Sequence, residues 1–205
     1  TVTLVASDGM ISTSKSFTAT FTPVNDAPVA AGSTQVVFED TKDNEFGIEM
    51  ANADPDGDTL TLSIATAGEP QHGSASVSGT TILYTPAANY NGQDSLTYQL
   101  TDPSGAAAQA TIQITVQSVN DLPVITGLPT AYATQEDAAA FTLPFTVSDV
   151  DGEALQVTMT HTNETLFPSL KLVGSGSDWH LEADSADNAF GTDTVTVTVK
   201  DAEGL

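Results

Sequence analysis

The chain repeats a set of turn motifs at a spacing of roughly 95 residues. The sequence VNDAP at residues 24–28 returns as VNDLP at residues 119–123, and DPDGD at residues 54–58 returns as DVDGE at residues 149–153. Landmarks that keep their distance while the loops between them vary in length are typical of tandem modules. Acidic landmarks recur as well: Glu39-Asp40 matches Glu136-Asp137, and Asp102 matches Asp8 and Asp201.

The segments between these landmarks show the two-residue alternation of β-strands. Leu96, Tyr98 and Leu100 alternate with polar residues, and the stretch 195–199 does the same with valine. Such alternation of β-branched and aromatic residues is typical of half-buried strands. Seven strands in roughly 95 residues predict an all-β fold of tandem immunoglobulin-like, seven-strand β-sandwiches. The strands expected in the first full copy are 33–39, 45–51, 58–66, 73–78, 80–85, 93–101 and 106–118.

The spacing of the repeated motifs predicts that the chain consists of three parts. Residues 1–25 correspond to the C-terminal hairpin of a preceding repeat, residues 26–120 to a complete repeat, and residues 121–205 to a second repeat of six strands that lacks its last strand. A hairpin by itself is marginally stable in water. Two explanations therefore stay open: the chain is a segment of a continuous fibre, or strands are exchanged between incomplete domains.

The charge of the chain is strongly negative, at −23, with 4 basic residues against 27 acidic ones. Such a surface repels nucleic acids and anionic membranes, so neither is an expected partner. The chain has no cysteine, which excludes disulfides, thiol catalysis and cysteine-based zinc sites. No apolar run approaches the roughly 20 residues of a membrane-spanning helix, so no membrane insertion is expected in this segment. Multivalent cations are the natural counter-charge.

The predicted strand order brings acidic segments together at one end of each sandwich. The loops after the second and sixth strands lie at the end where the preceding linker arrives, which we call the linker pole. The loop 54–58, Asp102 and the linker residues Asn25 and Asp26 are expected to meet there. Glu39 ends the first strand near the opposite pole, within reach of the next junction. The second linker pole is expected to gather Asn120, Asp121, Asp149, Asp151, Glu153 and Asp201.

Carboxylates that are packed together repel one another, by about 1 kcal/mol per pair at 4 Å in water and by about 4 kcal/mol at an effective dielectric of 20. Calcium relieves this repulsion, because it takes six to eight oxygen ligands from carboxylates, amides and backbone carbonyls. We therefore expect Ca²⁺ as the cofactor. An EF-hand is excluded, since Ala65 stands where that loop needs a glutamate. The alternative is that each Asp-rich loop is only a turn.

The repeat resembles the cadherin-like tandem repeats of large bacterial surface and secreted adhesins. The resemblance extends over the whole chain and rests on VNDAP, FED, DPDGDTL, PQHG and YTPAANYNGQDSLTYQLTD; the second copy keeps VNDLP, QED and DVDGEAL but departs from the last run. It implies a cadherin-type sandwich with calcium at the junctions between neighbouring repeats of the same polypeptide. The implied ligands are Glu39, Asn120, Asp121, Asp149, Asp151 and Asp201 at one junction, and Asn25, Asp26, Asp54, Asp56 and Asp102 at the other. Asp58 and Glu153 are further candidates that follow the loop glycine and would otherwise only cap a strand.

The favoured hypothesis is a calcium-stiffened extender or stalk of a bacterial cell-surface or secreted adhesin, located outside the cell. The alternative is a carbohydrate- or protein-binding β-sandwich module, calcium-dependent or not, with a cell-surface glycan or protein as its partner. Exposed aromatic platforms would favour that module, but Tyr84, Tyr90 and Tyr98 fit strand or turn positions. An enzyme is not expected, because the histidines show no triad or metal-ligand spacing. These histidines are His72, His161 and His180.

Overall fold

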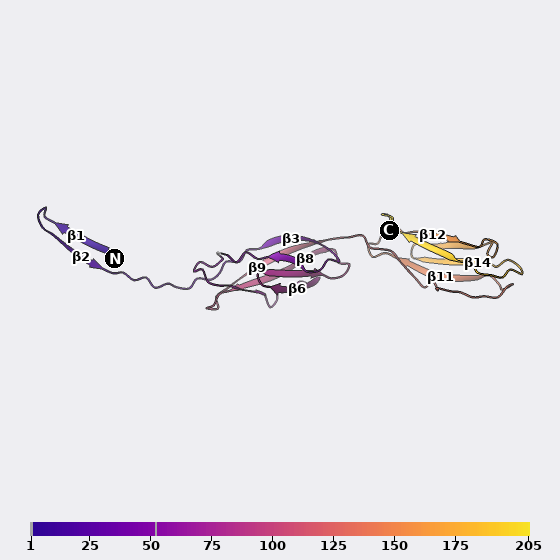
Figure 1. Cartoon of the computed structure of the whole chain (residues 1–205), viewed down its shortest axis with the longest axis horizontal. Coiled ribbons are helices and arrows are strands. Elements are labelled where there is room, and N and C mark those ends of the chain that lie inside the picture. The colour runs from indigo at the N-terminus through magenta and orange to yellow at the C-terminus, as the bar shows by residue number, and fades with distance from the viewer. Residues whose placement is uncertain (1, 52) are drawn as a thin grey trace. The chain divides into compact units, whose positions relative to one another are not determined.

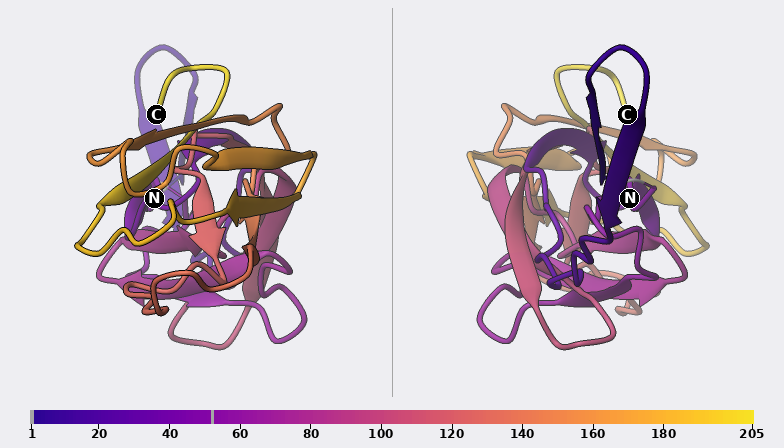
Figure 2. Two further views of the ribbon diagram at one scale, coloured as in Figure 1. Left: turned by 90° about the vertical axis from the view of Figure 1, so that its right-hand side faces the viewer. Right: turned by 90° about the vertical axis from the view of Figure 1, so that its left-hand side faces the viewer.

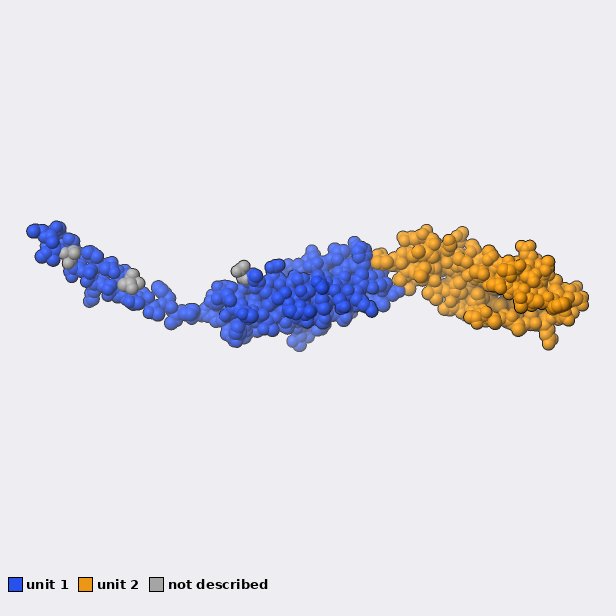
Figure 3. Space-filling view, in the orientation of Figure 1, with its two compact units in different colours: residues 1–117 blue, residues 118–205 orange. Residues whose placement is uncertain are grey.

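The computed structural model describes residues 2–51 and 53–205. All regular structure in these residues is β-strand (Figures 1 and 2), which confirms the predicted all-β fold. The chain divides into two compact units, residues 1–117 (unit 1) and residues 118–205 (unit 2) (Figure 3). The finer assignment of residues 1–25, 26–120 and 121–205 to three successive repeats stays a prediction.

Unit 1 contains a seven-strand sandwich of two sheets. One sheet has the strand order β3-β9-β8-β5 and the other has the order β4-β7-β6. The β3–β9 pair is parallel, and the other neighbours are antiparallel. The strands lie close to their predicted positions; the segments predicted at 45–51 and 58–66 differ most. They are β3 (Ser33–Phe38), β4 (Asn44–Gly47), β5 (Thr61–Ile64), β6 (Gly73–Ser78), β7 (Thr81–Pro86), β8 (Gly92–Thr101) and β9 (Ala107–Gln117).

The core of unit 1 forms between these two sheets. Leu96 and Leu100 of β8 and Ile112 and Ile114 of β9 are at most 1% exposed, and they alternate with exposed or half-exposed polar residues. Burying one such side chain stabilises the fold by about 1.5–3 kcal/mol. The two-residue alternation in the sequence thus becomes one buried face on each long strand.

The first two strands form a hairpin at the N-terminal end of unit 1. They are β1 (Val2–Ser7) and β2 (Ser12–Phe17), which pair with each other in a two-stranded antiparallel sheet. Every described side chain of this hairpin is exposed. Phe17 is 56% exposed, and Phe21, which follows β2, is 91% exposed. Among the described residues, the hairpin therefore has no core of its own.

Unit 2 repeats most of this arrangement. Its sheets have the orders β10-β11-β14-β13 and β12-β15. The β12–β15 pairing has the register of β5–β8, since Val157 faces Val199 as Leu62 faces Leu100. The strands are β10 (Val124–Thr126), β11 (Phe141–Ser148), β12 (Gln156–His161), β13 (Lys171–Ser175), β14 (Asp178–Ala183) and β15 (Val195–Lys200).

The start of unit 2 differs from its counterpart in unit 1. Six strands are present as the sequence predicts, but the first lies at Val124–Thr126, and residues 130–136 before Asp137 are not a strand. The matching segment of unit 1 is β3, which takes its backbone hydrogen bonds from β9. No described strand of unit 2 occupies the position of β9.

Each unit contains a buried aspartate that precedes or begins a long strand. Asp94 is 6% exposed and accepts hydrogen bonds from the backbone N–H groups of Gln71 and His72, both at 3.0 Å, and from the Tyr84 hydroxyl at 2.9 Å. Burial and the bond to Asp94 raise the pKa of Tyr84. The carboxylate thus fixes the turn before β6 against β7 and β8.

Asp193 makes the equivalent connection in unit 2. Its side chain, which is 1% exposed, accepts from the backbone N–H groups of Thr162 and Asn163 at 2.9 and 2.8 Å and lies 2.8 Å from His161 Nδ1. Burial opposes ionisation of Asp193, but the bonds from His161 and Thr162 outweigh it and lower the pKa. We call Asp94 and Asp193 the clamp aspartates.

The Asp94→Ala variant is expected to lose about 3 kcal/mol of unfolding free energy, because two backbone donors and one hydroxyl lose their buried acceptor. Tyr84→Phe removes one of these bonds and is expected to cost about 1 kcal/mol. Urea unfolding of both variants measures the difference. If the two substitutions have equal effects, the carboxylate does not act as the shared acceptor.

Candidate cation sites

The loop between β4 and β5 folds around one oxygen of Asp54. Asp54 Oδ1 accepts hydrogen bonds from the backbone N–H groups of Asp56 at 2.9 Å and of Asp58 at 3.3 Å. Gly57 takes a φ of 79°, a left-handed conformation that glycine adopts without a steric penalty. The loop is therefore an aspartate-stabilised turn, which is what the turn interpretation of the sequence predicts.

The corresponding loop of unit 2 has the same construction. Asp149 Oδ1 accepts the backbone N–H of Asp151 at 2.8 Å, and Gly152 has a φ of 72°. Glu153, which follows the glycine, accepts the backbone N–H of Ala202 at 3.3 Å. Glu153 thus reaches from this loop to the turn that follows β15.

The linker residues are attached to these loops by hydrogen bonds. The backbone N–H of Asp26 donates to Asp56 Oδ2 at 2.7 Å, and that of Asp121 donates to Asp151 Oδ2 at 2.8 Å. One carboxylate of each loop therefore holds the backbone of the chain that leads into the sandwich.

The asparagine beside each linker aspartate makes a second attachment. Asn25 Nδ2 donates to Asp102 Oδ2 at 2.8 Å, and Asn120 Nδ2 donates to Asp201 Oδ2 at 2.7 Å. The other oxygen of Asp102 accepts the backbone N–H of Ala106 at 2.9 Å. Asp201 Oδ1 likewise accepts from the backbone N–H groups of Gly204 and Leu205, at 2.6 and 2.9 Å. Linker, loop and strand end thus meet at the linker pole of each unit.

This network leaves particular oxygens without a partner. Asp54 Oδ2 and Asp149 Oδ2 are buried and accept no hydrogen bond from the described residues. Asp54 as a whole is 6% exposed. A buried carboxylate oxygen without a partner costs free energy, so its position calls for a proton or a cation.

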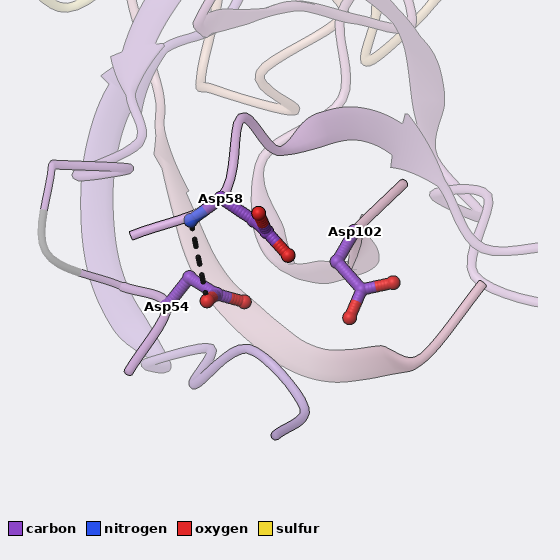
Figure 4. A group of neighbouring side chains, drawn as sticks. All are labelled: Asp54, Asp58 and Asp102. Atoms are coloured by element: carbon purple, nitrogen blue, oxygen red, sulfur yellow. Dashed lines mark hydrogen bonds between the residues drawn. The ribbon is translucent and has the colours of Figure 1, made fainter. Parts of the chain in front are cut away.

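The unpartnered Asp54 lies in a group of three carboxylates. One carboxylate oxygen of each of Asp54, Asp58 and Asp102 lies within 4.8 Å of the other two. Figure 4 shows the three side chains directed toward a shared space. At that separation a cation would contact several of them at once. The group found among the described residues thus belongs to the linker pole of unit 1.

The pKa values follow the hydrogen bonds and the crowding. The amide of Asn25 lowers the pKa of Asp102 although burial opposes it, and Asn120 does the same for Asp201. Burial raises the pKa of Asp58, and the charges of Asp54 and Asp102 add to this effect. The pKa shifts of Asp58 and Asp102 thus have opposite signs.

Glu39 lies at the other pole of unit 1. It is 2% exposed, and its backbone N–H donates to the carbonyl of Gln117 at 2.9 Å, at the end of β9. The chain continues from Gln117 into the linker that contains Asn120. The binding of a cation by Glu39, and by the twelve other residues proposed as ligands, stays a prediction.

The clamp aspartates were not singled out from the sequence. Each follows a glycine by two positions, in Gly92-Gln93-Asp94 and Gly191-Thr192-Asp193, so the repeat itself marks them. Their four or more hydrogen-bond donors explain why they are buried without a cation.

A comparison with protein families shows to which family this chain belongs. The bacterial Ig domain family matches it twice, over residues 25–115 and 120–205. The chain belongs to this family. No curated protein matches the chain. The immunoglobulin-like part of the predicted resemblance is thereby confirmed, whereas the setting in a bacterial adhesin stays a prediction.

One solved structure shares the fold of these bacterial Ig domains. The PcdhgB3 EC1-4 structure has a TM-score of 0.59 at 16% identity and covers 97% of this chain and 51% of its own length. The human desmocollin-1 ectodomain has a TM-score of 0.48 at 15% identity, over 90% of this chain and 36% of its own. The chain thus spans about half or less of these proteins, and the PcdhgB3 match shows the fold alone.

The Asn25–Asp102 contact predicts a response to acid. Because the folded pKa of Asp102 lies below its unfolded value of about 3.9, the contact stabilises the fold above that value. The stabilisation is lost as the pH falls through the lower, folded pKa. Asn25→Ala is expected to raise the Asp102 pKa measured by carboxyl NMR, whereas Asn91→Ala, an exposed change elsewhere, is not. An Asp102 pKa that is the same in both variants would contradict this role of Asn25.

Proposed function

We propose that the chain is a calcium-stiffened extender region of a bacterial cell-surface or secreted adhesin. The single observation that carries the proposal is the unpartnered, buried oxygen of Asp54 and of Asp149, placed at the same point of two matching linker poles. Each oxygen belongs to a loop that already holds the linker backbone through a neighbouring carboxylate. A cation at either position would therefore bind to the segment that connects successive repeats.

Calcium fits the available donors better than other biological cations do. The linker pole of unit 1 offers one carboxylate oxygen each from Asp54, Asp58 and Asp102, all within 4.8 Å of one another, and the Asn25 side chain is bonded to Asp102. Calcium accepts six to eight such oxygens in flexible geometry, whereas Mg²⁺ demands an octahedron and retains its waters. The absence of cysteine and the net charge of −23 favour a hard cation further.

Stiffening follows from where the ions would bind. An ion that binds only the ordered linker pole stabilises that arrangement by RT ln(1 + [Ca²⁺]/Kd). Glu39, at the far end of unit 1, would add a ligand from the preceding repeat to the cluster around Asn120 and Asp201. The partners of each repeat are then calcium ions and its neighbours in the same polypeptide.

A structural role is supported by how the chain uses its histidines. His161 bonds to the clamp Asp193 at 2.8 Å, His180 contacts Glu182 at 3.1 Å, and the ring of His72 stacks on Tyr90 at 4.1 Å. Each is engaged in a different part of the fold, so the three do not form a catalytic group. We therefore propose a role without catalysis.

Three of the four tyrosines favour a spacer over a glycan-binding module. Tyr84 and Tyr98 are buried, and their hydroxyls bond to Asp94 and to the carbonyl of Ala31. Tyr90 donates to the carbonyl of Gln93 and is stacked on His72. These rings serve internal contacts, which leaves none of the three as an open platform.

An extracellular position is consistent with the family, whose members are typically found outside the cell or on its surface. In the part of the chain that the structure describes, no helix has the length and apolar character needed to cross a membrane. We propose the bacterial surface or the surrounding medium as the location.

Calcium is expected to raise the melting temperature, by a stabilisation of about 2.7 kcal/mol at a hundredfold excess over Kd. Asp54→Asn together with Asp149→Asn should abolish most of this rise, because both buried oxygens lose their charge. In chelator the double variant should be at least as stable as the parent, since repulsion at the two poles is relieved. Calorimetry in calcium and in chelator measures both effects.

Asp187→Asn, an exposed change outside the linker poles, serves as the control and should keep the full calcium response. If the double variant and the control respond equally to calcium, the ion binds elsewhere. A parent protein that melts at one temperature in chelator and in millimolar calcium would remove the basis of the proposal.

Glu39→Gln is expected to weaken calcium binding at the second linker pole by about tenfold, or about 1.4 kcal/mol, because that pole loses a charged ligand. Binding at the Asp54 cluster should not change. Isothermal titration separates the two sites, with Glu45→Gln, a change of an exposed side chain of β4, as the matched control. An unchanged affinity at both poles would show that Glu39 has a role only within unit 1.

A further inference from the structure

One sheet of unit 1 presents an uncharged surface to the solvent. The strands β3, β9, β8 and β5 form this sheet, and since their buried residues face the core, the residues between them point outward. These fully described strands contain one charged residue, Asp94, which is buried as a clamp aspartate. The outward side chains of β8 and β9 are glutamines and threonines, with one serine and one alanine. We call the outward side of these four strands the uncharged face.

This face contrasts with the charge of the whole chain. The net charge is −23, and the acidic residues of unit 1 lie mainly in its loops. The outward side of the other sheet carries Glu45, whose side chain is exposed. Two copies of so acidic a chain repel each other wherever their carboxylates approach. The uncharged face is where this repulsion is smallest, and a depletion of charged residues is typical of the centre of protein interfaces.

The edge of the uncharged face exposes two large apolar side chains. Val36 and Phe38 of β3 are 62% and 52% exposed, and both point away from the core, because Val37 between them is buried. In the register of the sheet they lie beside Thr115 and Gln117 of β9. Contact with a partner would remove this apolar area from water, which is favourable.

Hydrogen bonds between neighbouring strands order the polar side chains of the face. The Oγ1 atoms of Thr97 and Thr111 are 3.0 Å apart, and Gln109 Nε2 donates to Gln99 Oε1 at 2.8 Å. Side chains that are already ordered lose less conformational entropy when a partner binds. Each hydroxyl and each amide both donates and accepts, so these groups keep further capacity for hydrogen bonds to a partner.

We propose that the uncharged face binds the same face of a second copy of this chain, with the two copies related by a two-fold axis. A two-fold contact requires a surface that is complementary to itself. Hydroxyl and amide groups meet this requirement, whereas a carboxylate near the axis would meet another carboxylate. A basic partner would instead be attracted to the acidic poles. The inference goes beyond the proposed extender, because this contact needs no bound cation.

The size of the face indicates a weak contact. Strands that lie about 4.8 Å apart and rise about 3.4 Å per residue give a four-stranded face of about 400–500 Å². Two such faces would bury about 900 Å² in total, which is typical of transient rather than permanent complexes. We therefore expect reversible dimers whose fraction increases with protein concentration. Salt is expected to strengthen the association, because it screens the repulsion between the remaining charges of the two copies.

The first test is sedimentation of the full chain over a range of protein concentrations, in low and high salt and with a chelator present. Ser95→Glu places a carboxylate on the uncharged face and should weaken the dimer about tenfold or more, because it brings like charges together. The matched control is Ser76→Glu, which changes an exposed serine of β6 on the other sheet and should leave the dimer unchanged.

The second test locates the contact by cross-linking, in a chain that has no cysteine of its own. A two-fold axis that passes through the face must bring at least one central position close to the same position of the other copy. Ser95→Cys, Thr97→Cys, Thr111→Cys and Gln113→Cys are therefore oxidised separately. At least one of them should form a disulfide-linked dimer faster than Ser76→Cys does.

Several results would overturn the proposal. A chain that stays monomeric in high salt, or dimers that form only with calcium present, would show that the uncharged face does not join two copies. Equal dimerisation of Ser95→Glu and Ser76→Glu, or equal cross-linking at all five cysteine positions, would place the contact elsewhere. A monomeric chain that is retained on a neutral polysaccharide through this face would assign the face to a glycan instead.

Discussion

Each loop aspartate has two carboxylate oxygens, and the fold of the linker pole depends on how they are divided. One oxygen of Asp54 accepts the backbone N–H groups that shape its own loop, and the other is buried without a partner. Asp149 divides its oxygens in the same way. The turn and the cation site are therefore compatible uses of one residue, because the turn needs only half of the carboxylate. The same loops also carry Asp56 and Asp151, whose second oxygens hold the linker.

Much of this arrangement could be predicted from the sequence. Counting strands placed Asn25 and Asp102 at one pole although they are far apart in the chain, and they are joined by a hydrogen bond of 2.8 Å. Strand alternation predicted the buried face of β8. The repeat of Gly-x-Asp could have marked the position of Asp94, but not its role, because its donors come from a turn some twenty positions earlier.

A comparison of the two units shows what the last strand contributes. The registers of β5–β8 and β12–β15 agree, yet Leu96 and Leu100 are fully buried while the valines of β15 are not. The segment 130–136 also remains outside the sheet, although the matching β3 is a regular strand. In unit 1, β9 supplies three core side chains and the edge on which β3 pairs, and no described strand of unit 2 holds that position. Sequence matching alone could not show this dependence, since it compares segments one at a time.

The clamp aspartates have a consequence for how the proposed extender would bend. Asp94 lies in β8, and Asp102 follows the end of that strand, so one strand connects a fully hydrogen-bonded carboxylate to a candidate cation ligand. The far pole is held by backbone and tyrosine donors whatever the ionic conditions. In the extender proposed above, withdrawal of calcium would then soften the hinges between modules while every module keeps its shape. The persistence length of that extender would vary with the surrounding medium, and its contour length would stay constant.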